Sequence, residues 1–523
     1  MRKIQYFFVL AAVSVLAASC ADSYLNQEPG GSSITEEQFN RMDNKVEGLV
    51  KGILPNFYMH FSDDHMSFGR RAIDMYGDLL CGDMAMPKAR YGWFMEHEQM
   101  QTYNSRGLLW GYYYGIIRSC NRSINMIEQE GMPSLNVSTD TLTESQLARG
   151  YFYAEALTLR GWAYSQLHNF FVAPGAAETD LSVPVYTESD TRNDTIIGNP
   201  RATVADLRLR IETDFLDAIQ YYDAYALWLR DSKIETNIDI ARILLAYAYL
   251  NKGDNVNALK YAEEAITNGS PYLLPYESVL TTGFNNVDNN DWIWGQKVTV
   301  ETTTSLASFF GQCDIYSYSY ASAGDVKGID KNLYESIPAW DIRKLWWNVY
   351  ASSGVKNADM FAYAPDGKFY SAKSHTIQGD RDWLSDNVYM RWELPYLIAA
   401  EAAARNSDLT KAQQYLFEIT DKRADPSLQT EYDAWKSSLT SQDLMLAAIK
   451  YNWRVELWGE GFGLQTFRRY GEAVTLGDNH LRQEKTINPS MPRRFTFEIP
   501  TGEIYYNPYL HSTMDEQQLQ KKI

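Results

Sequence analysis

Two glutamates near the C-terminal end have the spacing best suited to acid–base chemistry. Glu456 and Glu460 lie four residues apart, so on a helix both carboxylates would share one face and could act as proton donor and acceptor. The same arrangement also suits ion pairs with nearby guanidinium groups. The candidates are Arg454, Arg468 and Arg469. We favour this structural network, because no second catalytic motif accompanies the pair.

A glycine-rich run, GEGFG at 459–463, raises the alternative of a phosphate-binding loop. Such a loop follows a strand and ends in a Lys-Ser or Lys-Thr pair. This run follows WRVELW, which has helical character, and no such pair comes after it. The sequence also lacks GxSxG and HExxH motifs. We therefore interpret the run as a turn that ends a helix, and we expect no enzyme activity.

Two groups of potential metal ligands are present, and neither has the ordered spacing of a metal site. The first group comprises His60, Asp63, Asp64 and His65. These residues fall on different faces of a helix or loop, so we interpret them as a solvated cluster. Asp288 and Asp291 offer the hard oxygens that Ca²⁺ prefers, which leaves a structural calcium ion as an alternative. We expect no other cofactor.

The N-terminus has the pattern of an export signal that ends in a cysteine. Arg2 and Lys3 precede an apolar run at 4–16, which is shorter than the roughly 20 residues that span a membrane. Small residues then lead to Cys20, as in bacterial lipoproteins, in which the cysteine thiol carries diacylglycerol. A plain signal peptide with an unrelated cysteine is the alternative. We predict a signal peptide at 1–19 and a lipid anchor on Cys20.

Charge and cysteine content narrow the functional class further. The formal net charge is −18, which argues against a nucleic-acid ligand, because phosphates require a basic surface. Cys81, Cys120 and Cys313 are too few for a disulfide framework and show no zinc-binding spacing. We expect them to be buried as small apolar side chains, with one bridge at most.

Two segments predict matched helical hairpins of the tetratricopeptide type. Residues 240–266 and 394–419 each read as two amphipathic helices joined by a short polar turn. Ala246 and Ala258 are twelve residues apart, as are Ala400 and Ala412, and small residues allow two helices to cross closely. The turns Gly253-Asp254 and Ser407-Asp408 correspond to each other. Because one hairpin cannot bury its apolar face alone, further hairpins must stack beside these two. Strong helical patterns at 108–129, 145–171 and 203–222 supply the pieces.

Several segments together resemble the SusD-like (RagB/SusD) family of outer-membrane lipoproteins of the Bacteroidota. They are DSYLN at 22–26, RATV at 201–204 leading to IETDF at 211–215, AEA at 400–402, RVELWGEGFGLQTFRRYG at 454–471 and FEIPTGEIYYNP at 497–508. The order and spacing of these segments follow the family over nearly the whole mature chain. Asn452, Trp453 and Thr466 depart from residues that are frequent in the family.

The resemblance implies a mostly α-helical fold of about four tetratricopeptide-type hairpins with a loop-rich insertion that carries short strands. A lipidated tether at 20–38 would precede a single domain at 39–523. In that domain helices would lie mainly at 39–60, 105–130, 145–270 and 387–425, ligand-binding loops mainly at 61–104 and 271–386, and a helical closing segment at 440–523.

The resemblance also implies a role without catalysis. Family members bind oligosaccharide at the cell exterior and deliver it to a SusC-like TonB-dependent transporter in the outer membrane. An adaptor that binds the transporter, a peptide or another non-glycan nutrient is the alternative.

Aromatic residues in the loop-rich part are the expected ligand contacts. Flat rings stack on the apolar C–H faces of sugars at low entropic cost, and polar side chains then bind the hydroxyl groups. ARYGWF at 89–94 and DIYSYSY at 314–320 offer this mixture. The predicted contacts are Arg90, Tyr91, Trp93, Tyr318, Tyr320 and Trp346. The alternative for each ring is packing in the core, which we expect for Trp347.

Overall fold

A computed structural model describes most of the chain. The described residues are 42, 44–58, 65–95, 106–136, 141–192, 198–347, 361–371, 378–379, 381, 383–490 and 495–513. The predicted signal peptide, Cys20 and the predicted tether lie outside these residues, as do His60, Asp63 and Asp64. Within them, no helix is long and apolar enough to cross a membrane.

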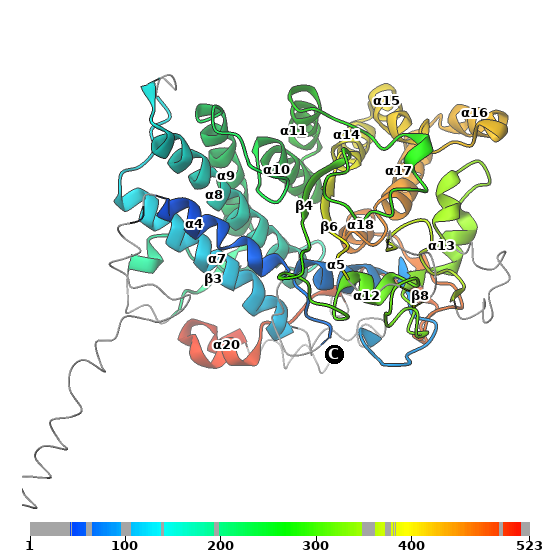
Figure 1. Cartoon of the computed structure of the whole chain (residues 1–523), viewed down its shortest axis with the longest axis horizontal. Helices are drawn as coiled ribbons and strands as arrows, with labels where there is room; N and C mark the ends of the chain where they lie inside the picture. The colour runs from blue at the N-terminus through cyan, green and yellow to red at the C-terminus, as the bar shows by residue number, and fades with distance from the viewer. Residues whose placement is uncertain are drawn as a thin grey trace, which may run out of the picture.

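The protein is mostly α-helical, as predicted, and its long helices stack in a row (Figure 1). Each helix of the row packs on the next one in the chain, and α17 packs on α14. The row comprises α7 (Arg106–Gln129), α8 (Glu144–Phe171), α9 (Val204–Ala224), α10 (Ile238–Lys252), α11 (Asn255–Asn268), α14 (Glu393–Arg405), α15 (Leu409–Thr420) and α17 (Gln442–Glu456). The short helix α4 (Lys45–Lys51) lies against α7 and α8.

The two predicted hairpins have the same turn geometry. Gly253 and Ser407 both adopt positive φ angles, +86° and +64°. The next residue in each turn is an aspartate that caps a helix: Asp254 Oδ1 accepts from the Asn257 N–H at 3.1 Å, and Asp408 Oδ1 accepts from the Lys411 N–H at 3.0 Å. A left-handed residue that ends one helix and a capping aspartate that begins the next fix the turn locally. The predicted correspondence of the two turns is confirmed.

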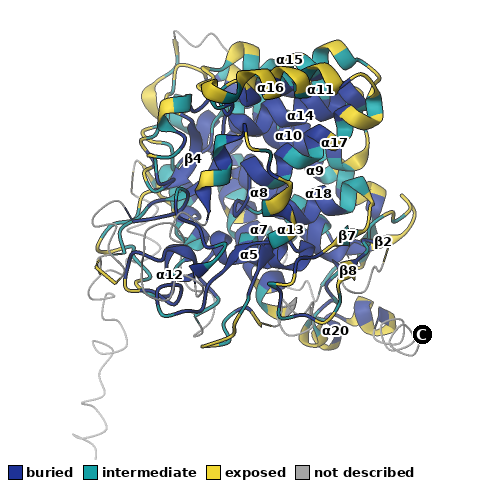
Figure 2. Cartoon of the chain, turned by 90° about the vertical axis from the view of Figure 1, so that its right-hand side faces the viewer, coloured by how far each residue is buried: buried dark blue, intermediate teal, exposed yellow. Residues whose placement is uncertain are grey.

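Burial follows the predicted pattern of small residues. Ala246, Ala258, Ala400 and Ala412 are all 0% exposed, which allows α10 to pack on α11 and α14 on α15. Figure 2 shows that α8, α10 and α14 are largely buried, whereas α11 and α15 also carry exposed positions.

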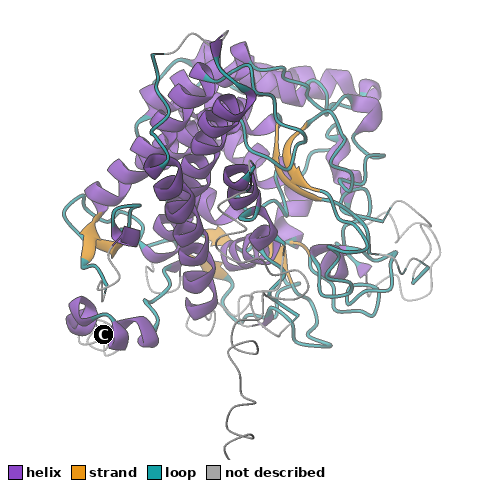
Figure 3. Ribbon diagram, turned by 60° about the vertical axis from the view of Figure 1, so that its left-hand side comes forward, coloured by secondary structure: helices purple, strands orange, loops and turns teal. Residues whose placement is uncertain are grey.

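The other side of the protein consists of loops, short helices and two-stranded sheets (Figure 3). Strands β4 and β6 pair antiparallel, with Trp292 opposite Arg391, and β1 pairs with β5. The elements are η1 (Leu54–Phe57), α5 (Arg70–Cys81), β1 (Met84–Ala85), η4 (Tyr276–Ser278), β4 (Trp292–Gln296), α12 (Phe309–Cys313), β5 (Gly328–Ile329), α13 (Lys331–Ser336), η5 (Ile342–Trp346) and β6 (Asn387–Arg391).

The remaining elements lie at the ends of the helical row and in the closing segment. They are β2 (Leu181–Pro184), η3 (Asp190–Arg192), β3 (Arg201–Thr203), η8 (Pro426–Leu428), α16 (Gln429–Ser438), α18 (Gly463–Tyr470), β7 (Val474–Thr475), β8 (Thr486–Ile487), α20 (Thr501–Tyr506) and η9 (Pro508–Leu510).

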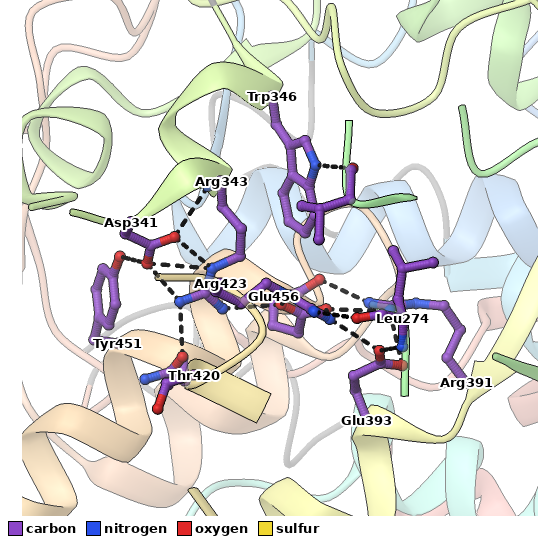
Figure 4. A network of polar contacts seen from close by, with 12 residues as sticks. Leu274, Asp341, Arg343, Trp346, Arg391, Glu393, Thr420, Arg423, Tyr451 and Glu456 are labelled. Carbon is purple, nitrogen blue, oxygen red and sulfur yellow. Dashed lines mark hydrogen bonds and ion pairs between the residues drawn. The ribbon is translucent and has the colours of Figure 1, made fainter. Parts of the chain in front are cut away.

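A buried network of charges joins the helical row to the loop-rich side (Figure 4). Glu456, the last residue of α17, accepts from three guanidinium groups. Its Oε2 lies 2.9 Å from Arg343 Nη1, and its Oε1 lies 3.1 Å from Arg391 Nη1 and 2.9 Å from Arg423 Nη2. All four side chains are 0% exposed. Arg423 foremost, with Arg391 and Arg343, holds the pKa of Glu456 well below its usual value against the opposing effect of burial.

The structural network is therefore present, but the predicted partners were wrong. Arg454 pairs with Asp83 at 2.7 Å, Arg469 pairs with Glu401 at 2.8 Å, and Arg468 donates to backbone carbonyls. Residues two apart on a helix point in different directions, so Arg454 cannot face the carboxylate of Glu456.

The glycine-rich run forms the predicted turn between α17 and α18. Gly459 and Gly461 have φ angles of +75° and +85°. A Cβ atom on Gly461 would lie 2.3 Å from Asp74 Oδ1. The turn packs so closely on α5 that no side chain fits at this position. Glu460 points inward from this turn and lies 2.9 Å from Arg391 Nη2 and 2.8 Å from Lys368 Nζ.

The three predicted core cysteines, Cys81, Cys120 and Cys313, are buried and unbridged. Burial raises the pKa of each thiol, to about 12 for Cys313. Within the described ranges, no group of three or more His, Cys, Asp and Glu residues could hold a metal ion. Asp291 is buried 3.8 Å from Arg391, whereas the Asp288 side chain is 79% exposed, so the two carboxylates lie in different surroundings.

Glu456→Gln keeps the shape of the side chain but removes the charge that three guanidinium groups share. We expect a loss of about 3–5 kcal/mol in the free energy of unfolding, because the buried cations then lack their common carboxylate. Urea unfolding followed by circular dichroism measures the loss. Glu431→Gln on α16 is the matched control, because Glu431 is exposed, and it should change stability by less than about 0.5 kcal/mol. Equal effects of the two substitutions would contradict this role of Glu456.

Candidate functional site

Two loops that are distant in the sequence place aromatic side chains together on the loop-rich side. One loop follows β1 and carries Tyr91 and Trp93, and the other follows α12 and carries Tyr318 and Tyr320. Tyr91 and Tyr318 are 52% and 40% exposed, which is unusual for large rings. We use the name aromatic platform for His65, Tyr91, Trp93, Tyr318, Tyr320 and Trp383.

Tyr320 lies at the centre of the aromatic platform and is only 7% exposed. Its ring contacts Tyr91 edge-to-face at a centroid distance of 5.1 Å and Trp93 at 6.1 Å. Its hydroxyl forms a hydrogen bond with His65 Nδ1, and the His65 ring stacks on Trp93 at 5.0 Å. Burial raises the pKa of Tyr320, so its hydroxyl stays protonated. Tyr320 thus fixes three neighbouring rings in defined orientations.

Tyr318 forms the outer part of the aromatic platform. The guanidinium of Arg381 lies 4.2 Å from the centre of its ring, and the Trp383 ring contacts it edge-to-face at 6.5 Å. Trp383 Nε1 also donates to the Tyr318 carbonyl at 2.8 Å. One face of Tyr318 is therefore covered by a cation, and the orientation of the ring is set by an indole.

Short hydrogen-bonded turns hold the loop that carries Tyr318 and Tyr320. The carboxylate of Asp314 accepts from the Tyr316 N–H at 2.8 Å and from the Ser317 N–H at 3.2 Å. The Tyr320 N–H donates to the Gly311 carbonyl at 2.9 Å. Burial raises the pKa of Asp314 to about 6. These local bonds give the loop a fixed backbone without regular secondary structure.

Arg90 joins the two loops of the aromatic platform. Its backbone N–H donates to Asp325 Oδ1 at 3.0 Å, and its guanidinium donates to the Ala323 carbonyl. Asp325 in turn pairs with the buried Lys327 at 3.0 Å. Arg90 is exposed, so other guanidinium N–H groups face solvent beside Tyr91.

A polar cleft, whose open volume of about 360 Å³ includes solvent at its mouth, adjoins the aromatic platform at Trp383. Hydroxyl and amide side chains supply much of its lining, with Tyr58, Phe68, Val298, Phe309 and Phe310. The polar residues are Gln296, Thr302, Thr303, Thr304, Ser308, Ser385 and Asn387. Hydroxyl-rich ligands need such donors and acceptors next to a stacking surface.

Five of the six predicted contact residues thus lie together, and one does not. Trp346 is 0% exposed, donates from Nε1 to the Val279 carbonyl at 2.8 Å, and packs edge-to-face on Phe284 at 5.4 Å. The prediction of a ligand contact at Trp346 is wrong, because the ring is enclosed in the core. The expectation that Trp347 belongs to the core is confirmed, since it is 1% exposed.

Sequence reasoning missed two members of the aromatic platform. His65 was grouped with neighbouring acidic residues as a solvated cluster, although its ring packs between Trp93 and Tyr320. Trp383 stands alone among polar residues, and no spacing in the sequence marks it as a surface ring. Both positions depend on contacts between segments more than 25 residues apart, which a local pattern does not reveal.

Two family models match the chain. The SusD-like model described as "Starch-binding associating with outer membrane" matches residues 24–227, and the SusD family model (SusD_RagB) matches residues 340–519. Together with the helical fold, these matches identify the class of protein: the chain belongs to the SusD-like family.

Solved structures support the same fold. Similar structures include a SusD-like carbohydrate binding protein from Bacteroides vulgatus, with a TM-score of 0.71, 22% identity, and coverage of 90% of this chain and 97% of that chain. A SusD superfamily protein from Bacteroides thetaiotaomicron has a TM-score of 0.69 and 21% identity, over 90% of this chain and 98% of that one. Surface glycan-binding protein A from Bacteroides thetaiotaomicron has a TM-score of 0.61 and 16% identity, over 88% and 97%. No curated protein matches the chain.

Replacing one ring at the surface and one ring in the core should distinguish a ligand contact from core packing, because the two substitutions should cost different amounts of stability. We expect Trp346→Ala to cost about 3–5 kcal/mol, because it opens a cavity among packed rings. Tyr318→Ala should cost about 1 kcal/mol or less, because that ring is 40% exposed. Thermal and urea unfolding measure both losses. If Tyr318→Ala lowered the free energy of unfolding as much as Trp346→Ala, the Tyr318 ring would have a packing role.

Proposed function

We propose that this protein is a cell-surface glycan-binding lipoprotein, which captures oligosaccharide and delivers it to a SusC-like TonB-dependent transporter without chemical conversion. The observation that carries the proposal is the aromatic platform, in which exposed rings from two distant loops surround a fixed centre. The carbohydrate-binding descriptions of similar proteins support the same ligand class.

The aromatic platform has the chemistry that sugar recognition requires. The exposed rings of Tyr91 and Tyr318 can stack on the C–H faces of pyranose units. The Tyr320 centre keeps its neighbours in place before binding, which lowers the entropic cost of association. Arg90 and Arg381 lie at the edges, where guanidinium N–H groups can donate to sugar hydroxyl groups.

The two candidate catalytic carboxylates are already engaged as ion-pair partners. Glu456 and Glu460 are buried, and arginines hold the pKa of each below its usual value despite burial. A general acid must hold its proton near the working pH, so neither group is suited to that task. This supports a binding role in place of catalysis.

A glycan panel tests the proposal. Affinity gel electrophoresis and titration calorimetry on the chain from Ala21 onward should identify one class of oligosaccharide that binds and is recovered uncleaved. Trp93→Ala and Tyr318→Ala should each weaken binding at least about fivefold, because one stacked ring contributes about 1–3 kcal/mol.

Tyr506→Ala is the matched control for the loss of an exposed ring. Tyr506 is 87% exposed on α20, and the substitution should leave affinity unchanged. Unchanged affinity in the Trp93 and Tyr318 variants would overturn the site. No binding to any glycan would favour the adaptor function, and turnover of a bound glycan would contradict the non-catalytic role.

Cys20→Ala tests the anchor. We expect the wild-type protein to fractionate with the outer membrane and the variant to be released, because two or three acyl chains provide stable attachment and a bare N-terminus does not. Mass spectrometry of the N-terminal peptide should find Cys20 carrying diacylglycerol. An unmodified Cys20 in membrane-bound protein would contradict lipid anchoring, and protease treatment of intact cells tests exposure to the exterior.

A further inference from the structure

A second cleft lies among the helices of the row and shares no lining residue with the aromatic platform or its polar cleft. Its open volume is about 760 Å³, which includes solvent at its mouth. It is lined from α5, α8, α9, α10, α14, β6 and the turn before α18. Its lining residues are Arg70, Trp162, Ser165, Gln166, His168, Asn169, Arg208, Ile211, Glu212, Leu244, Leu245, Tyr247, Ala248, Tyr249, Asn251, Lys252, Met390, Leu394 and Phe462.

Apolar side chains form much of the lining. Trp162, Leu245 and Leu394 are at most 1% exposed, and Phe462 is 8% exposed. Ala248 on α10 is half-buried and leaves space where a larger residue would fill the cleft. The apolar part of a ligand bound here would displace water from these apolar side chains, which is favourable.

Arg70 is a charged group in this apolar lining, and its hydrogen bonding is incomplete. Arg70 is the first residue of α5 and is 6% exposed. Its guanidinium carbon lies 5.2 Å from the centre of the Trp162 ring, and Nη2 donates to the Tyr389 carbonyl at 2.9 Å. Nη1 is buried and has no hydrogen-bond partner among the described residues.

No carboxylate completes the coordination of Arg70. Among the described residues its ion-pair partner is Asp74, whose Oδ1 lies 3.9 Å from Nε, and Asp74 also pairs with Arg71 at 2.9 Å. Burial lowers the pKa of Arg70 and outweighs the opposing effect of Asp74. A buried cationic N–H group without an acceptor is costly, and an anionic ligand would remove that cost.

The polar part of the cleft lining contains two further cations besides Arg70. Lys252 lies 3.6 Å from the lining carboxylate Glu212, and Arg208 pairs with Glu178, which lies outside the lining. Burial, with Arg208 and Arg468, lowers the pKa of His168 to about 3, so this imidazole is neutral. Arg208 and Lys252 thus each have a carboxylate partner, whereas Arg70 Nη1 has no acceptor among the described residues. The position for an anionic ligand in this cleft is therefore at Arg70.

We propose that this cleft binds a small organic acid with an apolar body, whose carboxylate accepts from Arg70 Nη1 and whose body lies against Trp162, Leu245 and Leu394. A carboxylate can accept from the unpaired Arg70 Nη1, and an alkyl or aromatic group attached to it can pack on the apolar lining.

Matched pairs of probes test the charge requirement. We would titrate octanoate and 3-phenylpropanoate into the chain from Ala21 onward by calorimetry, with octanamide and 3-phenylpropanamide as uncharged equivalents. At least one acid should bind saturably at one site, at least about tenfold more tightly than its amide, because a charge-assisted hydrogen bond contributes that difference.

Two substitutions test the location of the site. Ala248→Phe should abolish acid binding by filling the cleft, whereas the matched control Ala248→Ser should retain it. Arg70→Lys should weaken binding at least about tenfold. The lysine side chain is shorter, and its ammonium group cannot donate the two parallel hydrogen bonds of a guanidinium group. If Arg70→Lys fails to fold, the Ala248 pair alone decides the location.

Any of three results would overturn the proposal. They are no saturable binding of either acid, equal binding of acid and amide, and unchanged binding in Ala248→Phe. Glycan binding at the aromatic platform is measured separately, so a negative result for one site does not affect the proposal for the other.

Discussion

The balance of buried charge around Glu456 is the constraint on which the rest of the structure depends. Among the described residues, four cations gather here: Arg343, Arg391, Arg423 and Lys368. They meet five carboxylates: Asp341, Glu393, Glu456, Glu460 and Asp291. The group thus has one carboxylate more than it has cations. Burial and the neighbouring Glu393 raise the pKa of Asp291 to about 7, so Asp291 is the carboxylate that takes up a proton most readily.

This network also explains how an irregular half keeps a defined shape. Its members come from η5, β6, α14 and α17, from the residues directly before η5 and β4, from the turns after α15 and α17, and from the loop that carries Lys368. Buried ion pairs need well-defined geometry to offset the loss of hydration, so they favour the placement of these elements in which every pair is formed. The loop with Tyr318 and Tyr320 and the segment that begins at Trp383 lie in the chain between elements held in this way. The network thus fixes chain positions on both sides of each of these loops.

The sequence allowed the helical half to be predicted well because its signals are local. The turn at Gly253-Asp254 encodes a helix end and a helix start within two residues, and Ser407-Asp408 repeats it. The partners of Glu456 were missed because Arg343 lies 113 residues away and Arg391 lies 65 residues away, distances over which spacing carries no information. Residue type gave the composition of the site but did not distinguish an exposed ring such as Tyr318 from an enclosed one such as Trp346. That difference arises only when the loops are folded against the core.

The three buried thiols have a consequence for how the fold responds to redox conditions. Cys81, Cys120 and Cys313 are unbridged in the core, and burial raises the pKa of each, so they remain protonated and unreactive. The described part of the fold therefore contains no disulfide bond, and packing and internal ion pairs stabilise it instead. Among these residues a reductant has no covalent cross-link to break.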